Sequence, residues 1–454
     1  MALRKTVIIG GSDAGISAGL RVKELAPVTD VTLILADAYP NFSICGLPFY
    51  LSGEVPDWET LAHRTMDEIR REGIRVVPQQ RVSAIHTEQR QVIAEDSAGH
   101  AQAFQYDKLL IATGGKSVVP DIPGIHLPGV FFLRWMRDGF ALQEHLLAHR
   151  PSSIAIIGGG YIGMEMADAM ARRGLRATVI EYLPSVLATF DQAFGRIVRA
   201  ELEQHGVRVV TGFPVERIES GGNGLSVCSG VTAVTADLVL VAVGSQPESR
   251  LAQSAGIAAG VRGAIPVNRR METGMPNIYA AGDCAETYHR LLDRNTYLPL
   301  GTTAHKQGRV AGENVAGGNR EYGGTLGTQS VKIFNLVAAR TGLKDDEALK
   351  EGMSPLSVDL GAWDHKSYYP KAQKIQIRIT GDKVTGRLLG MQMIGPYGAE
   401  VSKRMDTIAA AIHHGMTVEA LNDLDLSYTP PLSSPWDPVQ MAAQAWTEEA
   451  YGRA

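Results

Sequence analysis

Two segments of this chain repeat one pattern, in which an apolar strand runs into a glycine turn, a helix and a second apolar strand. The first repeat begins with Val-Ile-Ile-Gly-Gly-Ser-Asp-Ala-Gly at residues 7–15 and ends with a strand at residues 31–35. The second begins with Ile-Ala-Ile-Ile-Gly-Gly-Gly-Tyr-Ile-Gly at residues 154–163 and ends at residues 177–181. A glycine turn that opens a helix directs backbone N–H groups at a phosphate, so each repeat can hold a pyrophosphate. The pattern therefore predicts an α/β fold that binds two dinucleotides.

The second repeat has the complete dinucleotide pattern. Gly158, Gly160 and Gly163 have the spacing Gly-x-Gly-x-x-Gly, and Glu181 closes the second strand roughly 20 residues on. A carboxylate at that place accepts hydrogen bonds from a ribose 2′-hydroxyl and repels a 2′-phosphate. The repeat therefore favours NADH over NADPH, unless Glu181 is only a solvated charge at the end of a strand.

The first repeat departs from this pattern. Ser12 stands at the middle glycine position, and Leu35 occupies the position expected for the strand-end carboxylate. Asp37 follows two residues later and is our candidate for the ribose contact of the first dinucleotide.

Three further apolar strands end beside chemically useful residues. One runs into Thr113 and Gly114 and another into Gly244, and these two would close the repeats. A third ends in Asp283, whose carboxylate either serves a ligand or caps the following helix.

The size and charge of the chain narrow the protein class. A chain of 454 residues is long enough for roughly three domains. A net charge of -4 gives no basic surface for nucleic acid, and no apolar run is long enough to cross a bilayer. The first strand begins almost at Met1, which leaves no room for a secretory signal, and three widely spaced cysteines argue against a secreted disulfide framework. We therefore expect a cytoplasmic enzyme with no metal site, no nucleic-acid partner and no membrane association.

Cys45 follows the first repeat and has no second cysteine near it. The position five residues on, where a dithiol enzyme carries its second sulfur, is Tyr50. A lone cysteine here suggests one-thiol redox chemistry on a flavin, with the second sulfur or oxygen taken from the substrate. Because the thiolate is the nucleophile, we expect the site to lower the pKa of Cys45, through the helix that follows it and the flavin. The alternative is an inert buried cysteine, which is our interpretation of Cys228 and Cys284.

Over essentially its full length the chain resembles the flavin-dependent pyridine nucleotide-disulfide oxidoreductases. The segment from Thr273 to Asp283 is similar to the second flavin motif of that family, whose aspartate holds the ribityl chain. The resemblance implies bound FAD, NADH as the reductant and a homodimer. The implied fold class is α/β, with two Rossmann-like dinucleotide-binding domains, for FAD and NAD, and an α+β C-terminal dimerisation domain. The implied boundaries are a split FAD-binding domain at 1–117 and 248–322, an NAD(H)-binding domain at 118–247 and an interface domain at 323–454.

Segments spread along the chain indicate the single-cysteine branch of that family. They are similar to the coenzyme A-disulfide reductase and NADH oxidase signatures and comprise residues 43–50, 327–334, 365–370 and 426–434. The dithiol branch carries an acid-base histidine near its C-terminus, where this chain has Tyr428. By the resemblance, Tyr428 and one of Tyr368 and Tyr369 reach the active site from the partner subunit, where a phenol can protonate a leaving thiolate.

Two roles are open for Cys45. In a disulfide reductase it rests as a mixed disulfide with a small thiol, whereas in a peroxidase or oxidase it cycles as a sulfenic acid. Peroxidases of this branch carry a histidine in the first glycine turn, and the matching residue here is Asp13, which weakens a peroxide-reducing role. Asp13 is either catalytic or simply a carboxylate favoured at a helix N-terminus.

The predicted function is a FAD-dependent NAD(P)H oxidoreductase that reduces a small-molecule disulfide or persulfide through Cys45. Coenzyme A derivatives are the first candidates, as substrate or as adduct, and Arg21 and Lys23 could meet coenzyme A phosphates or be solvated. One alternative is an NADH oxidase that reduces dioxygen through a cysteine sulfenic acid. Another, from a different class, is a flavoprotein reductase that passes electrons to a protein partner. The physiological sulfur substrate and the strength of the NADH preference stay open.

The predicted catalytic residues are Cys45, Tyr428, Tyr369, Tyr368 and Asp13. Within the second repeat, the resemblance makes Tyr161 the lid of the nicotinamide pocket and places Glu165 in its lining. The predicted cofactor-binding residues are Gly10, Gly11, Ser12, Ala14, Gly15, Asp37, Ser43, Ala112, Thr113, Gly114, Asp283, Gly158, Gly160, Tyr161, Ile162, Gly163, Glu165, Glu181 and Gly244.

Overall fold

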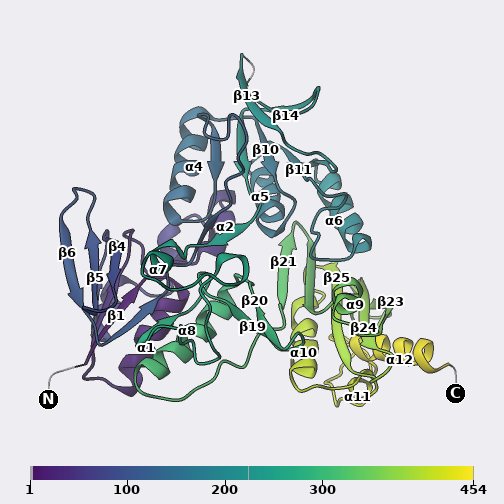
Figure 1. Ribbon diagram of the computed structural model, residues 1–454. Helices are drawn as coiled ribbons and strands as arrows, with labels where there is room; N and C mark the ends of the chain where they lie inside the picture. The colour runs from purple at the N-terminus through teal and green to yellow at the C-terminus, as the bar shows by residue number, and fades with distance from the viewer. Residues whose placement is uncertain (1–3, 223, 453–454) are drawn as a thin grey trace.

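The computed structural model describes residues 4–222 and 224–452, which form three parts (Figure 1). The first part combines the N-terminal segment with a later, green segment that contains α8, while the teal middle part lies above it and the yellow-green third part lies beside it (Figure 1). Within these described residues, every helix is too short or too polar to span a membrane.

The elements of each part follow in chain order. The first part contains β1 (Lys5–Ile9), α1 (Asp13–Leu25), β2 (Asp30–Ile34), α2 (Leu47–Ser52), α3 (Met66–Arg71), β3 (Ile74–Val77), β4 (Arg81–His86), β5 (Gln91–Glu95), β6 (Ala101–Gln105), β7 (Lys108–Ile111), β8 (Gly115–Ser117), and later β17 (Ser245–Pro247), α7 (Arg250–Ser254), β18 (Ile278–Ala280), β19 (Thr287–His289), β20 (Arg294–Thr296) and α8 (Gly301–Val315). The middle part contains β9 (Val130–Phe132), α4 (Met136–His149), β10 (Ser153–Ile157), α5 (Tyr161–Arg172), β11 (Arg176–Ile180), α6 (Gln192–Gln204), β12 (Arg208–Val210), β13 (Arg217–Gly221), β14 (Gly224–Ser229), β15 (Thr232–Ala236) and β16 (Leu238–Val241). The third part contains β21 (Gln329–Ile333), β22 (Leu336–Gly342), α9 (Asp345–Lys350), β23 (Pro355–Trp363), β24 (Lys374–Asp382), β25 (Leu388–Pro396), α10 (Val401–His413), α11 (Val418–Asn422) and α12 (Pro438–Tyr451).

The first and middle parts are built on the same plan. Each has a parallel sheet, of order β18-β7-β1-β2-β3 in the first part and β12-β11-β10-β16-β9 in the middle part. In each part an antiparallel sheet, β4-β5-β6 or β13-β14-β15, is inserted before the strand that returns beside the first one. The strands β1 and β10 are buried along almost their whole length, as expected for parallel strands covered on both faces. The expected α/β class with two Rossmann-like units is confirmed.

Glycines are required at matching places in the two turns. Gly10 and Gly158 have φ angles of +113° and +112°, a conformation that side chains rarely adopt. A Cβ on Gly15 would lie 1.9 Å from the carbonyl oxygen of Gly10, and a Cβ on Gly163 would lie 1.9 Å from that of Gly158. Helix and turn can therefore approach each other this closely only without side chains at these positions.

The chain crosses between the first and middle parts through two short strands that lie together. β8 pairs antiparallel with β17, and the Lys116 ammonium lies 3.1 Å from the Glu248 carboxylate. The predicted boundaries after residues 117 and 247 fall in this pair of strands, and they stay predictions.

The third part is an antiparallel sheet of order β21-β22-β25-β24-β23 packed against helices. Its core gathers side chains from the sheet and from α10 and α12, including the fully buried Trp446. This is the α+β domain expected at the C-terminus.

Candidate active site at Cys45

Cys45 lies in a tight turn at Ile44–Gly46, directly before α2. Backbone hydrogen bonds join this segment to the first glycine turn, because Asn41 N donates to Gly11 O at 2.8 Å and His63 N donates to Asn41 O at 3.0 Å. A Cβ on Gly46 would lie 2.5 Å from a methyl carbon of Leu61, so the turn packs tightly against the chain behind it. Cys45 is thus held beside the N-terminus of α1.

An aromatic cluster packs around the segment that leads to Cys45. Tyr39, Phe42, Trp58 and Phe140 pack with ring centroids 5.0 to 5.8 Å apart. Tyr50 joins this cluster through an edge contact with Phe140 at 6.3 Å. The residue at the position of a second sulfur is therefore a packing residue.

The protein groups around Cys45 do not favour its thiolate. The thiol is exposed, yet neighbouring atoms crowd it, and this partial desolvation is the main cause that raises its pKa. The carboxylates of Glu165 and Asp13 raise the pKa further, while Arg134 opposes them. The expectation that the site lowers the Cys45 pKa is therefore wrong for the protein groups, since carboxylates on α5 and α1 face the sulfur and α2 is only six residues long.

Tyr161 and Glu165 lie on the first turns of α5, which opens from the second glycine turn. Burial is the main cause that raises the pKa of Glu165 to about 7, and the nearby Asp168 adds to it. Burial likewise raises the pKa of Tyr161 to about 12, so its phenol stays protonated near neutral pH. Glu165 can therefore gain or lose a proton near neutrality.

Asp283 follows β18 and forms an ion pair with Arg134, which lies between β9 and α4. Both side chains are largely buried, so the pair fixes a carboxylate and a guanidinium at the edge of the first parallel sheet. The sequence pattern indicates Asp283 but gives no signal for Arg134. Arg134 belongs to no motif, and only the packing of the middle part against the first brings it there.

The first glycine turn lies beside the residues that follow β7, at the edge of the sheet that carries Asp283. The turn is formed by Gly10, Gly11, Ser12, Ala14 and Gly15, and Ala112, Thr113 and Gly114 follow β7 beside it. Thr113 donates its hydroxyl hydrogen to the Glu248 carbonyl oxygen at 2.5 Å. Leu35 fills the space below Gly11, with a methyl carbon 3.2 Å from where a Cβ would be. Asp37 is partly buried nearby, and its carboxylate accepts from Tyr39 N at 2.9 Å.

The second turn carries a fixed carboxylate. Glu181 accepts hydrogen bonds from Gly159 N at 2.6 Å and from Leu183 N at 2.8 Å, so both of its oxygens are engaged. A Cβ on Gly160 or on Gly244 would meet no protein atom within 4 Å, which leaves the space above the turn free for a ligand. These residues fit a dinucleotide, and Glu181 is an ordered part of the turn and not a solvated strand end.

The three predicted tyrosines lie together on the surface of the third part. Tyr368, Tyr369 and Tyr428 are 72%, 42% and 43% exposed. Lys366 N donates to Pro430 O at 3.3 Å, which joins the two loops that carry them. Desolvation and the neighbouring phenol of Tyr368 raise the pKa of Tyr428.

Arg404 holds these two tyrosine loops in place. Its buried guanidinium donates to the carbonyl oxygens of Asp364 at 2.6 Å and Leu432 at 3.4 Å, and it also reaches the Asp437 carboxylate at 3.2 Å. One residue of α10 therefore fixes residues next to both tyrosine segments. The sequence pattern of α10 gave no signal for it.

Arg21 and Lys23 already have partners within the chain. Arg21 pairs with Glu24 at 2.8 Å and Glu313 at 2.6 Å, and Lys23 donates to the Thr29 carbonyl oxygen at 2.5 Å. A coenzyme A phosphate would have to displace these contacts.

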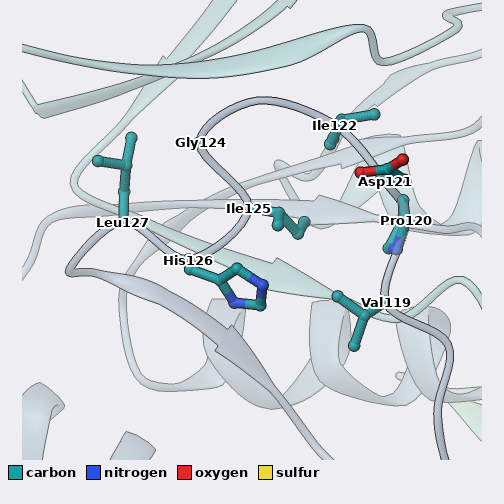
Figure 2. A pocket seen from close by; sticks show the side chains of 8 residues that line it. All are labelled: Val119, Pro120, Asp121, Ile122, Gly124, Ile125, His126 and Leu127. Atoms are coloured by element: carbon teal, nitrogen blue, oxygen red, sulfur yellow. The ribbon is translucent and has the colours of Figure 1, made fainter.

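Two surface hollows lie away from the Cys45 sulfur. One, of about 510 Å³, is formed by the loop at residues 119–127 between β8 and β9, and Figure 2 shows the residues that line it, which are mostly apolar and include Asp121 and His126. The other, of about 550 Å³, lies over α4 and is lined in part by Tyr50 and Leu147. Neither is lined by the charged residues that surround Cys45. In the described part of the chain, no three His, Cys, Asp or Glu side chains are grouped to hold a metal ion.

Comparison with protein families covers most of the chain. The family model described as pyridine nucleotide-disulphide oxidoreductase matches residues 4–308, and the model for the dimerisation domain of that family matches residues 328–438.

Several relatives are similar over nearly their full length. An NAD(P)H sulfur oxidoreductase (CoA-dependent) of Pyrococcus furiosus is 35% identical over 445 residues, which is 98% of this chain and 99% of that protein. An NADH oxidase of Methanocaldococcus jannaschii is 30% identical over 445 residues, 97% of this chain and 98% of that protein.

Solved structures give the same result. Reduced Bacillus anthracis CoADR-RHD superposes with a TM-score of 0.96 at 33% identity, covering 100% of this chain and 81% of that chain. A NAD-dependent persulfide reductase from A. fulgidus superposes with a TM-score of 0.95 at 33% identity, covering 99% of this chain and 84% of that chain.

Proposed function

Because this chain belongs to the pyridine nucleotide-disulphide oxidoreductases, we propose that it reduces a small-molecule disulfide or persulfide of the coenzyme A type with NAD(P)H, through Cys45. The observation that carries the proposal is the single thiol at the first glycine turn, with Tyr50 at the place of a second sulfur. One relative that matches over nearly the full chain is named as a CoA-dependent NAD(P)H sulfur oxidoreductase.

The residues of the site have separate roles in cofactor binding and in the sulfur chemistry. The glycines of the two turns bind the pyrophosphates of FAD and of the nicotinamide nucleotide, and Asp283 with Arg134 holds the flavin side of the site. When bound, the flavin supplies the two-electron transfer between reduced nicotinamide and the sulfur at Cys45. Cys45 itself attacks the substrate disulfide and holds half of it as a mixed disulfide.

Glu181 supports NADH as the preferred reductant. Its carboxylate is held by two backbone N–H groups, so it cannot turn away from a 2′-phosphate. Tyr161 and Glu165, on the helix that opens from the same turn, would line the nicotinamide pocket.

The active unit would be a homodimer in the cytoplasm. The dimerisation-domain match and the exposed phenols of Tyr368, Tyr369 and Tyr428 support a third part that covers the Cys45 site of a partner subunit. A cytoplasmic location suits an unpaired redox thiol, because that compartment keeps thiols reduced. Sedimentation of the FAD-loaded protein tests the dimer.

A second candidate is an NADH oxidase that reduces dioxygen, a function carried in the name of one relative. In that reaction Cys45 would cycle as a sulfenic acid. Asp13 at the position of the peroxidase histidine favours the sulfur substrate over this alternative.

The test is steady-state NADH oxidation against coenzyme A disulfide, coenzyme A persulfide, polysulfide, peroxide and dioxygen. We expect a sulfur substrate to be turned over fastest, and Cys45→Ser to abolish that turnover. Cys228→Ser is the matched control, because that thiol lies on a hairpin of the middle part. Full turnover of every acceptor by Cys45→Ser would refute the thiol mechanism and favour simple electron transfer to a partner.

A further inference from the structure

The helices α1 and α8 touch backbone to backbone beside the Cys45 site. A Cβ on Gly308 would lie 2.3 Å from the Ala14 carbonyl oxygen, and a Cβ on Gly312 would lie 2.4 Å from that of Ala18. Contact this close brings the side chains at the start of α8 over the start of α1. His305, one turn before Gly308, is placed there.

His305 makes contacts with both of its ring nitrogens. Its Nε2 lies 3.4 Å from a carboxylate oxygen of Asp13, and its Nδ1 lies 2.9 Å from the Ser17 hydroxyl. The other Asp13 oxygen packs over the first residue of α8, 3.2 Å from where a Cβ of Gly301 would be. The His305 side chain is 46% exposed, so the ring also reaches solvent.

Charged groups from several segments face Asp13. Burial is the main cause that raises its pKa, while His305, His63 and Arg134 lower it and Asp283 raises it. The His63 ring centroid lies 6.4 Å from that of His305. Asp13 in turn interacts electrostatically with the Cys45 thiol. The Asp13 carboxyl group therefore interacts electrostatically with both the Cys45 sulfur and the solvent-exposed imidazole of His305.

We propose that Asp13 and His305 share one proton, and that Asp13 delivers it to the thiolate released when Cys45 attacks a disulfide. This rests on the proposed function. Asp13 acts as the proton donor, whereas His305 is a positioning residue that holds the Asp13 carboxyl group in place and connects it to solvent.

The step balances as a thiol-disulfide exchange. The Cys45 thiolate forms a bond to one sulfur of the substrate, the substrate S–S bond breaks, and its electron pair leaves with the second sulfur. That sulfur takes the shared proton and departs as a thiol. Asp13 is left as an anion beside His305, and the pair takes up a proton from water.

Tyr428 is the alternative proton donor on the chain, and its pKa is less well matched to neutral pH. A phenol with a raised pKa, such as Tyr428, is a weak acid there, and a proton donor works best when its pKa lies near the working pH. Burial raises the pKa of the half-buried Asp13 carboxyl group, which lies 3.4 Å from the His305 imidazole.

The experiment compares two leaving groups. An alkyl thiolate, as from coenzyme A disulfide, needs a proton to leave, whereas an aromatic thiolate, as from dithiobis-nitrobenzoate, leaves as a stable anion. We expect Asp13→Asn to lower kcat for coenzyme A disulfide by about 100-fold and His305→Gln by about 10-fold, with the aromatic disulfide changed less than about twofold. Lys306→Gln, an exposed neighbour on α8, should leave both rates unchanged.

The results separate this proposal from the proposed function. If Asp13→Asn and His305→Gln lower the turnover of both disulfides equally, or of neither, the shared proton is overturned. The proposed function still stands in that case, provided that Cys45→Ser is inactive. Turnover of coenzyme A disulfide by Cys45→Ser would overturn the thiol function itself. The flavin absorbance of each variant shows that a change in rate does not come from loss of FAD.

Discussion

The proposed preference for NADH rests on one carboxylate and can be tested by removing its charge. Glu181→Gln keeps the shape of the side chain while removing the negative charge that two backbone N–H groups hold beside the turn. A 2′-phosphate carries a charge of about −2 at neutral pH. At a separation of about 6 Å in water, its repulsion from the carboxylate is about 1.4 kcal/mol, or about tenfold in affinity, and more where the permittivity is lower.

We therefore expect Glu181→Gln to raise kcat/KM for NADPH by about tenfold or more and to lower that for NADH several-fold, measured with one sulfur substrate. Because salt screens charges over about 10 Å at 0.1 M and about 3 Å at 1 M, the wild-type preference should shrink at high ionic strength. Glu203→Gln, which removes an exposed carboxylate on α6, is the control. An unchanged ratio of the two kcat/KM values in Glu181→Gln would show that the preference does not come from this charge.

Three further predictions follow from the geometry. The pKa of Glu165 is raised from 4.5 to about 7 in the folded protein. The stability that Glu165 contributes is therefore present below about pH 4.5 and is lost as the pH rises through about 7, and the loss is at most about 3 kcal/mol. Glu165→Gln should therefore melt above the wild type at about pH 8 but not at about pH 5, and equal thermal midpoints at both would contradict the raised pKa. Gly163→Ala forces a Cβ against a carbonyl oxygen and should unfold the second turn. Gly160→Ala places a Cβ where it meets no protein atom, so it should only raise KM for NADH. The reverse pattern in thermal melts would refute this explanation. Arg404→Met should cost about 3–5 kcal/mol of unfolding free energy, because it leaves the buried Asp437 carboxylate without its cationic partner. Adding Asp437→Asn should recover part of this loss in denaturant unfolding, and strictly additive losses would be evidence against the pair.

The parts of the site that lie within one short segment could be predicted from the sequence. The two glycine turns and Glu181 each stand at positions that local backbone geometry defines, and the structure has them at those positions. A positive φ angle or a close carbonyl oxygen leaves little choice but glycine, so the spacing is readable directly.

The environment of Cys45 could not be predicted in the same way. The pKa of its thiol is raised because carboxylates from two other helices face it, and no local pattern records that approach.

The sequence by itself therefore determined the fold class and the two glycine turns, and it supplied the predictions of a redox role for Cys45 and of NADH as the preferred reductant. Only the tertiary structure decided which charges surround the thiol: His305 beside Asp13, Arg134 beside Asp283 and Glu165 near the sulfur. The physical reason is that spacing along a chain encodes backbone turns, whereas the pKa of a group depends on every charge and every desolvating atom that packing brings within a few ångströms, however distant in sequence.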